Sequence, residues 1–171
     1  MRSTSNLDFP KPIFLSVGRL AVEKNLGAFL SLDLPGTKVI VGDGPARAAL
    51  EAAYPDAYFL GSQTGDALAE IYSSADVFVF PSMTDTFGLV LLEAMSSGLP
   101  VAAFPVPGPL DVIGKSGAGV LDENLKYACL KALEIPRSKA RTHAETFSWR
   151  ASAQQFLMNL MTVDPSYRAN L

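Results

Sequence analysis

Short runs of apolar, partly β-branched residues alternate along the chain with longer stretches of helical spacing. Most of these runs are apolar throughout, which is typical of parallel strands buried on both faces. The predicted strands are Ile13–Val17, Lys38–Val41, Ala57–Leu60, Val77–Phe80, Val101–Phe104 and Gly119–Leu121. The predicted helices lie near Asn25–Leu32, Ala46–Ala53, Asp66–Ser74, Leu89–Ser97 and Asn124–Leu133, with one or two closing helices in Arg137–Met161. This alternation predicts an α/β fold, a Rossmann-like doubly wound parallel sheet of about six strands with helices on both faces.

Composition narrows the class of protein. The 171 residues, 49% of them hydrophobic, suffice for the core of one α/β domain. The net charge is −3 and the 14 Lys and Arg form no basic stripe, which argues against nucleic-acid binding. No apolar run approaches the roughly 20 residues of a membrane span. The polar start lacks a secretory signal, and a single cysteine, Cys129, allows neither an internal disulfide nor a multi-cysteine metal site, so we expect a cytoplasmic protein.

Glycine, proline and hydroxyl residues gather in the segments that follow the predicted strands. In a parallel sheet these segments lie at the carboxyl ends of the strands, where such folds bind ligands. They are Gly18–Leu20 with Glu23–Asn25, Gly42–Pro45, Gly61–Ser62, Pro81–Gly88 and Pro105–Pro109. The opposite edge has ordinary connections, such as Ala75–Asp76. The asymmetry predicts a ligand crevice along one edge of the sheet.

Two of these segments carry candidate phosphate ligands. Arg19 and Lys24 suit a diphosphate, because Arg binds it as a fork and Lys as a point charge, and Gly18 would let the backbone approach closely. A solvated basic pair is the alternative for the two cations. Gly42-Asp43-Gly44 is similar to a phosphate-binding turn but lacks the full G-x-G-x-x-G pattern. A tight strand-to-helix turn therefore explains its glycines equally well.

The stretch from Thr84 to Met95 carries the strongest signal. A helix is predicted to begin near Gly88, and the free N–H groups of Gly88 and Leu89 would form a site for phosphate or sugar oxygens. Asp85 lies in the loop just before this helix. Glu93 is a carboxylate in an otherwise apolar helix and needs a partner, which ribose hydroxyls would supply. A solvent-facing or salt-bridged Glu93 is the alternative.

Four motifs follow one another in a fixed order. They are Val17-Gly-Arg-Leu20, Glu23-Lys-Asn25, Val41-Gly-Asp-Gly-Pro45, and Asp85-x7-Glu93 within a segment that runs from Phe80-Pro-Ser to Gly-Leu-Pro-Val101. In this order and spacing they resemble the retaining GT-B glycosyltransferases of the glycosyltransferase group 1 family, and specifically their C-terminal, donor-binding domain. The resemblance extends roughly from Phe14 to Trp149. It is specific for the superfamily and not for a donor or an acceptor.

The resemblance implies a role for each candidate residue. Arg19 and Lys24 would bind the donor diphosphate during catalysis. Asp85 matches the first acid of the E-x7-E motif, which contacts the transferred sugar, although the commoner Glu is one methylene longer. Glu93 matches the second acid, which holds the ribose. Substrate contacts are further implied for Gly18, Gly42, Asp43 and Gly44. Gly61 and Ser62 would lie near the base of the nucleotide, and the backbone N–H groups of Phe87, Gly88 and Leu89 would contact the sugar and phosphate.

The resemblance also implies a domain organisation and an activity. Such enzymes have two Rossmann-like domains, and this chain is similar only to the second. Residues 1–12 would be a linker remnant and residues 13–171 the nucleotide-sugar-binding domain, inactive alone because the N-terminal acceptor domain is absent. The implied reaction moves a hexose from a nucleoside-diphosphate sugar to a sugar or lipid acceptor with retention, without metal or cofactor. A nucleotide-sugar epimerase and a non-catalytic nucleotide-sugar-binding module are the alternatives, and membrane association of the full-length protein stays open.

Overall fold

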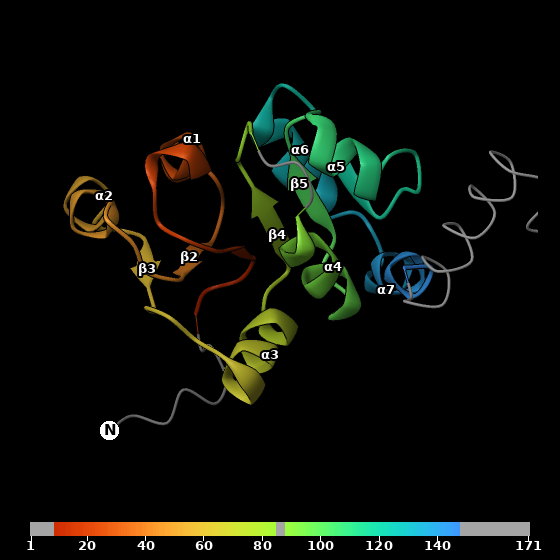
Figure 1. The fold of residues 1–171 in the computed structure, drawn as a ribbon, viewed down its shortest axis with the longest axis horizontal. Helices are drawn as coiled ribbons and strands as arrows, with labels where there is room; N and C mark the ends of the chain where they lie inside the picture. Colours follow the sequence, from red (N-terminus) through yellow and green to blue (C-terminus); the bar gives the residue numbers. More distant parts are fainter. Residues whose placement is uncertain (1–8, 85–87, 148–171) are drawn as a thin grey trace, which may run out of the picture.

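The computed structural model describes residues 9–84 and 88–147, and within them six strands form one parallel sheet (Figure 1). The strands are β1 Ile13–Val17, β2 Thr37–Val41, β3 Tyr58–Phe59, β4 Val77–Phe80, β5 Val101–Ala103 and β6 Gly119–Leu121. Their order is β3-β2-β1-β4-β5-β6, with every neighbouring pair parallel. The predicted Rossmann-like α/β fold is thereby confirmed. The strand order reverses between β1 and β4, and ligands of such sheets bind at this switch point.

Helices cover both faces of the sheet, and α1 and α3 lie on opposite sides of it in Figure 1. One face packs against α1 Leu26–Leu30, α2 Arg47–Ala53 and α6 Leu125–Ala132. The other face packs against α3 Gly65–Ser74, α4 Leu89–Ser96, α5 Pro107–Val112 and α7 Arg137–Glu145. A short 3-10 turn, η1 Val22–Lys24, connects β1 to α1. The connections that leave β1 and β4 therefore run to opposite faces.

Alternate side chains of the central strands enter two separate hydrophobic cores. Ile13 and Leu15 of β1 pack on the α4 face, whereas Phe14 between them packs on the α1 face. In β4, Phe78 joins the first core and Val79 the second. Each large apolar side chain buried in this way stabilises the fold by about 1.5–3 kcal/mol. Because helices cover both faces of the sheet, apolar side chains are favoured on both faces. This explains why the strand sequences show no alternation of apolar and polar positions.

Two predicted segments differ from the structure. Pro105–Pro109 was expected to be a loop, but α5 begins at Pro107, because proline at the first helical position has the right φ and needs no N–H partner. The first helix begins at Leu26, and Asn25 precedes it in a left-handed conformation. Part of the predicted closing helical stretch is confirmed as α7, and the positions of that prediction beyond Phe147 lie outside the described residues.

Candidate functional site

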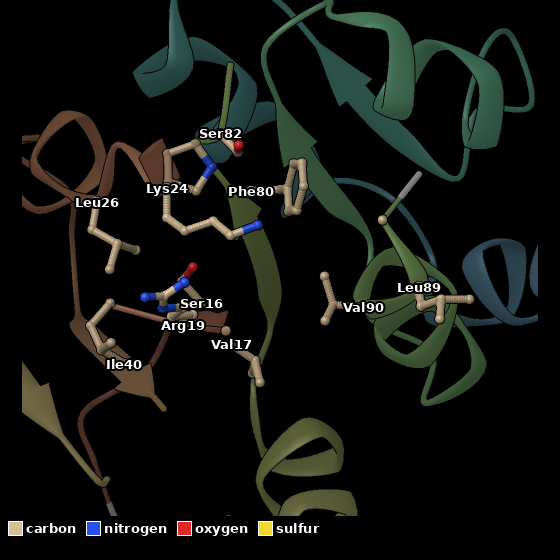
Figure 2. A pocket seen from close by; sticks show the side chains of 13 residues that line it. Ser16, Val17, Arg19, Lys24, Leu26, Ile40, Phe80, Ser82, Leu89 and Val90 are labelled. Atoms are coloured by element: carbon tan, nitrogen blue, oxygen red, sulfur yellow. The ribbon is translucent and has the colours of Figure 1, made fainter. Parts of the chain in front are cut away.

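A cavity of about 300 Å³ lies at the carboxyl ends of β1 and β4 (Figure 2). It forms because the connections after these neighbouring strands part toward opposite faces of the sheet. Its lining comes from β1 and the following loop, from β2, from the end of β4 and from the start of α4. The lining residues are Ser16, Val17, Gly18, Arg19, Lys24, Leu26, Ile40, Phe80, Pro81, Ser82, Gly88, Leu89 and Val90.

The two predicted phosphate ligands share this cavity. In Figure 2 the side chains of Arg19 and Lys24 reach into it from the β1 side and Val90 of α4 faces them, whereas the Leu89 side chain points away from them. The Arg19 side chain is exposed, and Lys24 is half-buried at the end of η1, where its N–H donates to the Ala21 carbonyl oxygen at 3.0 Å. Two cations that are five positions apart in the sequence thus face one space.

The first turn of α4 faces the two cations. The helix begins at Leu89 as predicted, with Gly88 as its N-cap residue, which has no side chain to cap the end. Leu91 N–H already donates to the Gly88 carbonyl oxygen at 2.9 Å. The N–H groups that precede it in the first turn have no partner within the helix, so they and the helix dipole favour an anion. A negatively charged ligand in the cavity would therefore meet positive charge from two sides.

Two hydrogen bonds connect neighbouring parts of the cavity lining. The Asn25 side-chain amide donates to the Pro81 carbonyl oxygen at 3.1 Å, and the Ser82 hydroxyl donates to the Glu23 carbonyl oxygen at 3.4 Å. They join the loop after β1 to the loop after β4. The position of the Lys24 segment relative to the end of β4 thus depends on contacts between segments that are more than fifty residues apart in the sequence.

The Gly42-Asp43-Gly44 turn lies behind the Arg19 loop and does not line the cavity. Leu20 N–H donates to the Asp43 carbonyl oxygen at 2.9 Å, and Ala46 N–H donates to the Leu20 carbonyl oxygen at 3.0 Å. A Cβ atom on Gly42 would lie 1.9 Å from the Gly18 carbonyl oxygen, and one on Gly44 would lie 2.4 Å from that of Leu20. The glycines are therefore needed for the close packing of two loops, which favours their interpretation as parts of a tight strand-to-helix turn. A contact between this turn and the substrate stays a prediction.

The Asp43 side chain is engaged within the protein. Its carboxylate accepts hydrogen bonds from Gly44 N–H at 2.7 Å and from the Arg47 guanidinium at 3.2 Å. Arg47 also donates to Glu51 at 2.8 Å and lies against Gly61, where a Cβ atom would be 3.2 Å from Nη1. Gly61 and the exposed Ser62 thus lie next to this turn and outside the cavity lining, and their contact with a base stays a prediction.

Glu93 has a partner inside the protein that the sequence did not indicate. Its carboxylate accepts a hydrogen bond from the Tyr72 hydroxyl of α3 at 3.1 Å. The Glu93 side chain is exposed and does not line the cavity, although it lies one helical turn beyond Leu89, which does. A bond to ribose stays a prediction. The predictions for Asp85 and Phe87 concern positions outside the described residues.

The cavity also contains two buried hydroxyl residues that were not predicted. Ser16 is 5% exposed and Ser82 is 1% exposed. Ser16 is the single polar residue in the otherwise apolar strand Ile13–Val17, and that exception was the available signal. Leu26, Ile40 and Phe80 give the rest of the lining an apolar character. The cavity thus combines cations at its mouth with hydroxyl and apolar groups deeper inside, a combination that suits a polyhydroxylated phosphate ligand.

Residues 9–84 and 88–147 contain neither a metal-binding cluster nor a membrane-spanning helix. In this part of the chain no three His, Cys, Asp or Glu side chains gather as they would around a metal ion. Within the same residues, no helix has the length and apolar character needed to cross a membrane.

Comparison with known proteins gives the family. Sulfoquinovosyl transferase SQD2 of Arabidopsis thaliana is 40% identical over 167 residues, which cover 86% of this chain and 33% of that protein. A GDP-mannose-dependent alpha-mannosyltransferase of Mycobacterium tuberculosis is 47% identical over 113 residues, which cover 65% of this chain and 30% of that protein. The crystal structure of the pneumococcal O-GlcNAc transferase GtfA in complex with UDP and GlcNAc has a TM-score of 0.70 at 25% identity, over 93% of this chain and 37% of that one.

The chain spans about a third of the length of these curated relatives. The family model described as Glycosyl transferases group 1 matches residues 11–134, which include every strand of the sheet and the whole cavity lining. The chain belongs to the glycosyl transferases group 1 family.

Proposed function

We propose that this chain binds the nucleoside-diphosphate sugar donor of a glycosyltransferase in the cavity between β1 and β4. The observation that carries the proposal is the meeting of Arg19, Lys24 and the N-terminus of α4 around one space. A diphosphate suits such a space, because charge-assisted hydrogen bonds from cations and free backbone N–H groups are the strong interactions of phosphate oxygens.

Two relatives support the class of donor. The mycobacterial mannosyltransferase is named as dependent on GDP-mannose, and the pneumococcal GtfA structure contains UDP and GlcNAc. Both are proteins of this chain's fold or family that act with a nucleoside diphosphate or its sugar. The cavity volume of about 300 Å³ lies at the lower end of small-molecule sites, so it would hold the diphosphate and sugar while the base lies outside.

The proposed chemistry places negative charge where the cations are. As the bond between the anomeric carbon and the phosphate oxygen breaks, charge grows on the leaving diphosphate, and Arg19, Lys24 and the α4 dipole offset it. In the retaining reaction the acceptor oxygen bonds to that carbon on the same face, and the acceptor proton passes to the departing phosphate oxygen. Asp85 would contact the sugar hydroxyls during this step.

We further propose that the acceptor is held by a second Rossmann-like domain that closes over the cavity. Three large apolar side chains in the segments that supply the lining support such a cover, because they are exposed in this chain: Val22 by 90%, Leu89 by 65% and Met83 by 50%. Exposed large apolar side chains next to a binding site are typical of a surface that another body covers. Closure would also exclude water from the sugar during transfer.

Isothermal titration calorimetry of the chain with UDP, GDP and ADP, and with the matching nucleosides, tests the proposal. We expect one diphosphate to bind, and Arg19→Ala and Lys24→Ala each to weaken its binding at least about tenfold, since each removes a charged hydrogen bond. Nucleoside binding should not change. Arg141→Ala, which alters an exposed arginine of α7, is the matched control and should leave both affinities unaltered.

Two results would contradict the proposal. Absence of binding at millimolar concentrations of all three diphosphates would remove the donor site. Equal losses for diphosphate and nucleoside in the Arg19 and Lys24 variants would separate these cations from the phosphates.

A further inference from the structure

Tyr72 of α3 lies beside Glu93 of α4 and points its hydroxyl at the carboxylate. The Tyr72 side chain is 3% exposed, and its ring centroid lies 6.0 Å from that of Phe78 in β4. The hydroxyl donates to Glu93 Oε2 at 3.1 Å. The tyrosine is thus anchored in the core by its ring, while its polar end reaches the surface of the next helix.

The direction of this hydrogen bond is determined by the surroundings of Tyr72. Burial, together with the adjacent Glu93 carboxylate, raises the pKa of the Tyr72 hydroxyl well above its ordinary value. The hydroxyl therefore keeps its proton and acts as the donor, and the carboxylate oxygen accepts. Among residues 9–84 and 88–147, Tyr72 is the one side chain that donates a hydrogen bond to the Glu93 carboxylate.

The bond restricts a side chain that is otherwise free to move. Glu93 is exposed, and an exposed glutamate has three rotatable bonds and many rotamers. Holding Oε2 against a buried, rigid donor selects the rotamers that place the carboxylate next to α3. Oε1 and the remaining lone pair of Oε2 stay available to accept further hydrogen bonds.

The held carboxylate belongs to a residue one helical turn beyond the part of α4 that lines the cavity. Glu93 follows Leu89 by four positions, so it lies about one turn further along α4, and its hydrogen bond to Tyr72 directs its side chain toward α3. Leu89 lines the cavity. A ligand bound at the first turn of α4 by its phosphates therefore needs to extend only one helical turn to place a pair of hydroxyls against the carboxylate.

We propose that Tyr72 is a positioning residue, which orients the Glu93 carboxylate so that it accepts hydrogen bonds from the vicinal hydroxyls of the donor ribose. The inference rests on the proposed function, because it requires a nucleotide to bind along α4. Its energetic basis is preorganisation: a carboxylate already oriented by Tyr72 loses less conformational freedom when the diol binds.

Tyr72→Phe tests the proposal, since it removes only the hydroxyl and keeps the ring that packs on Phe78. Calorimetry compares the nucleoside diphosphate that the wild-type chain binds, among UDP, GDP and ADP, with its 2′,3′-dideoxy counterpart. We expect Tyr72→Phe to weaken binding of the ribonucleotide about three- to tenfold, the effect of one hydrogen bond, and to leave the dideoxynucleotide unchanged. Tyr54→Phe, a half-buried tyrosine on the other face of the sheet, is the matched control.

A double-variant cycle with Glu93→Gln separates positioning from a structural role. If Tyr72 acts through Glu93, Tyr72→Phe adds little to the loss that Glu93→Gln already causes. Equal losses for the two nucleotides, full additivity, or unchanged ribonucleotide affinity would overturn the role of Tyr72 while leaving the donor site intact. A wild-type chain that binds none of the three diphosphates would overturn the proposed function and this inference with it.

Discussion

Replacement of Gly42 by alanine is expected to displace the loop that carries Arg19. Gly42 has a φ of +135°, a backbone conformation that residues with a Cβ atom rarely adopt. A Cβ atom there would lie 1.9 Å from the Gly18 carbonyl oxygen and 2.9 Å from the Gly18 carbonyl carbon. Both atoms belong to the backbone and cannot rotate away, so the two loops must separate.

The expected loss of stability comes from two sources. A non-glycine residue in a sparsely populated backbone region costs about 1–3 kcal/mol. Separation of the loops also weakens the hydrogen bonds from Gly18 N–H to the Val41 carbonyl oxygen and from Gly42 N–H to that of Gly61, which are 2.9 and 2.8 Å long. Each such bond contributes about 0.5–1.5 kcal/mol. Together these effects predict a loss of about 2–6 kcal/mol, a large part of the 5–15 kcal/mol typical of a folded domain.

Urea unfolding followed by circular dichroism measures this loss as a lower midpoint at unchanged slope. Gly27→Ala in α1 is the matched control, because a Cβ atom there meets only the Tyr54 hydroxyl at 3.4 Å, an ordinary contact. Alanine is also the better helix former by about 0.5–1 kcal/mol, so this variant should be as stable as the wild type or slightly more so. If Gly42→Ala proved as stable as Gly27→Ala, the reasoning from close packing of the two loops would be wrong.

Two further predictions concern stability. Burial raises the pKa of the Cys129 thiol from 9.0 to about 12. Between these pH values the folded state keeps a proton that the unfolded state has lost. The stability that comes from the protonated thiol is therefore present below pH 9 and lost between pH 9 and 12. The free energy of unfolding of the wild type, relative to that of Cys129→Ala, should therefore fall by up to about 1.4 kcal/mol per pH unit above pH 9. A difference between the two proteins that stays constant from pH 8 to pH 10.5 would contradict burial of the thiol. Arg137 of α7 donates to the carbonyl oxygens of Ala75, Ser73 and Ser97 at 2.6, 3.1 and 3.1 Å, which joins the ends of α3 and α4 to α7. Arg137→Ala should lower the free energy of unfolding by about 1.5–3 kcal/mol and Arg137→Lys by less, whereas a loss of under about 0.5 kcal/mol in the alanine variant would show that these bonds exchange freely with water.

Local patterns along the sequence were enough to identify the strands and the edge where ligands bind. The limits of β1, β4 and β6 agree with the predicted ranges, and the agreement has its clearest physical reason in β4, where a strand buried on both faces needs an uninterrupted apolar run. The carboxyl ends of parallel strands lie at one edge whatever their order, so the Arg19 and Gly88 segments could be assigned to that edge without knowledge of the strand order.

Only the tertiary structure decided which of these segments meet. The pairing of β1 with β4, which are sixty residues apart in the sequence, creates the cavity and places Arg19 opposite α4. The hydrogen-bond partner of Glu93 is a tyrosine on another helix. A glycine is needed at position 42 because a carbonyl oxygen of another loop leaves no room for a Cβ atom. Periodicity reports which face of an element is buried, but packing between distant segments determines its neighbours. A local pattern therefore revealed the candidate ligands, and the close approach of separate loops determined which of them share one site.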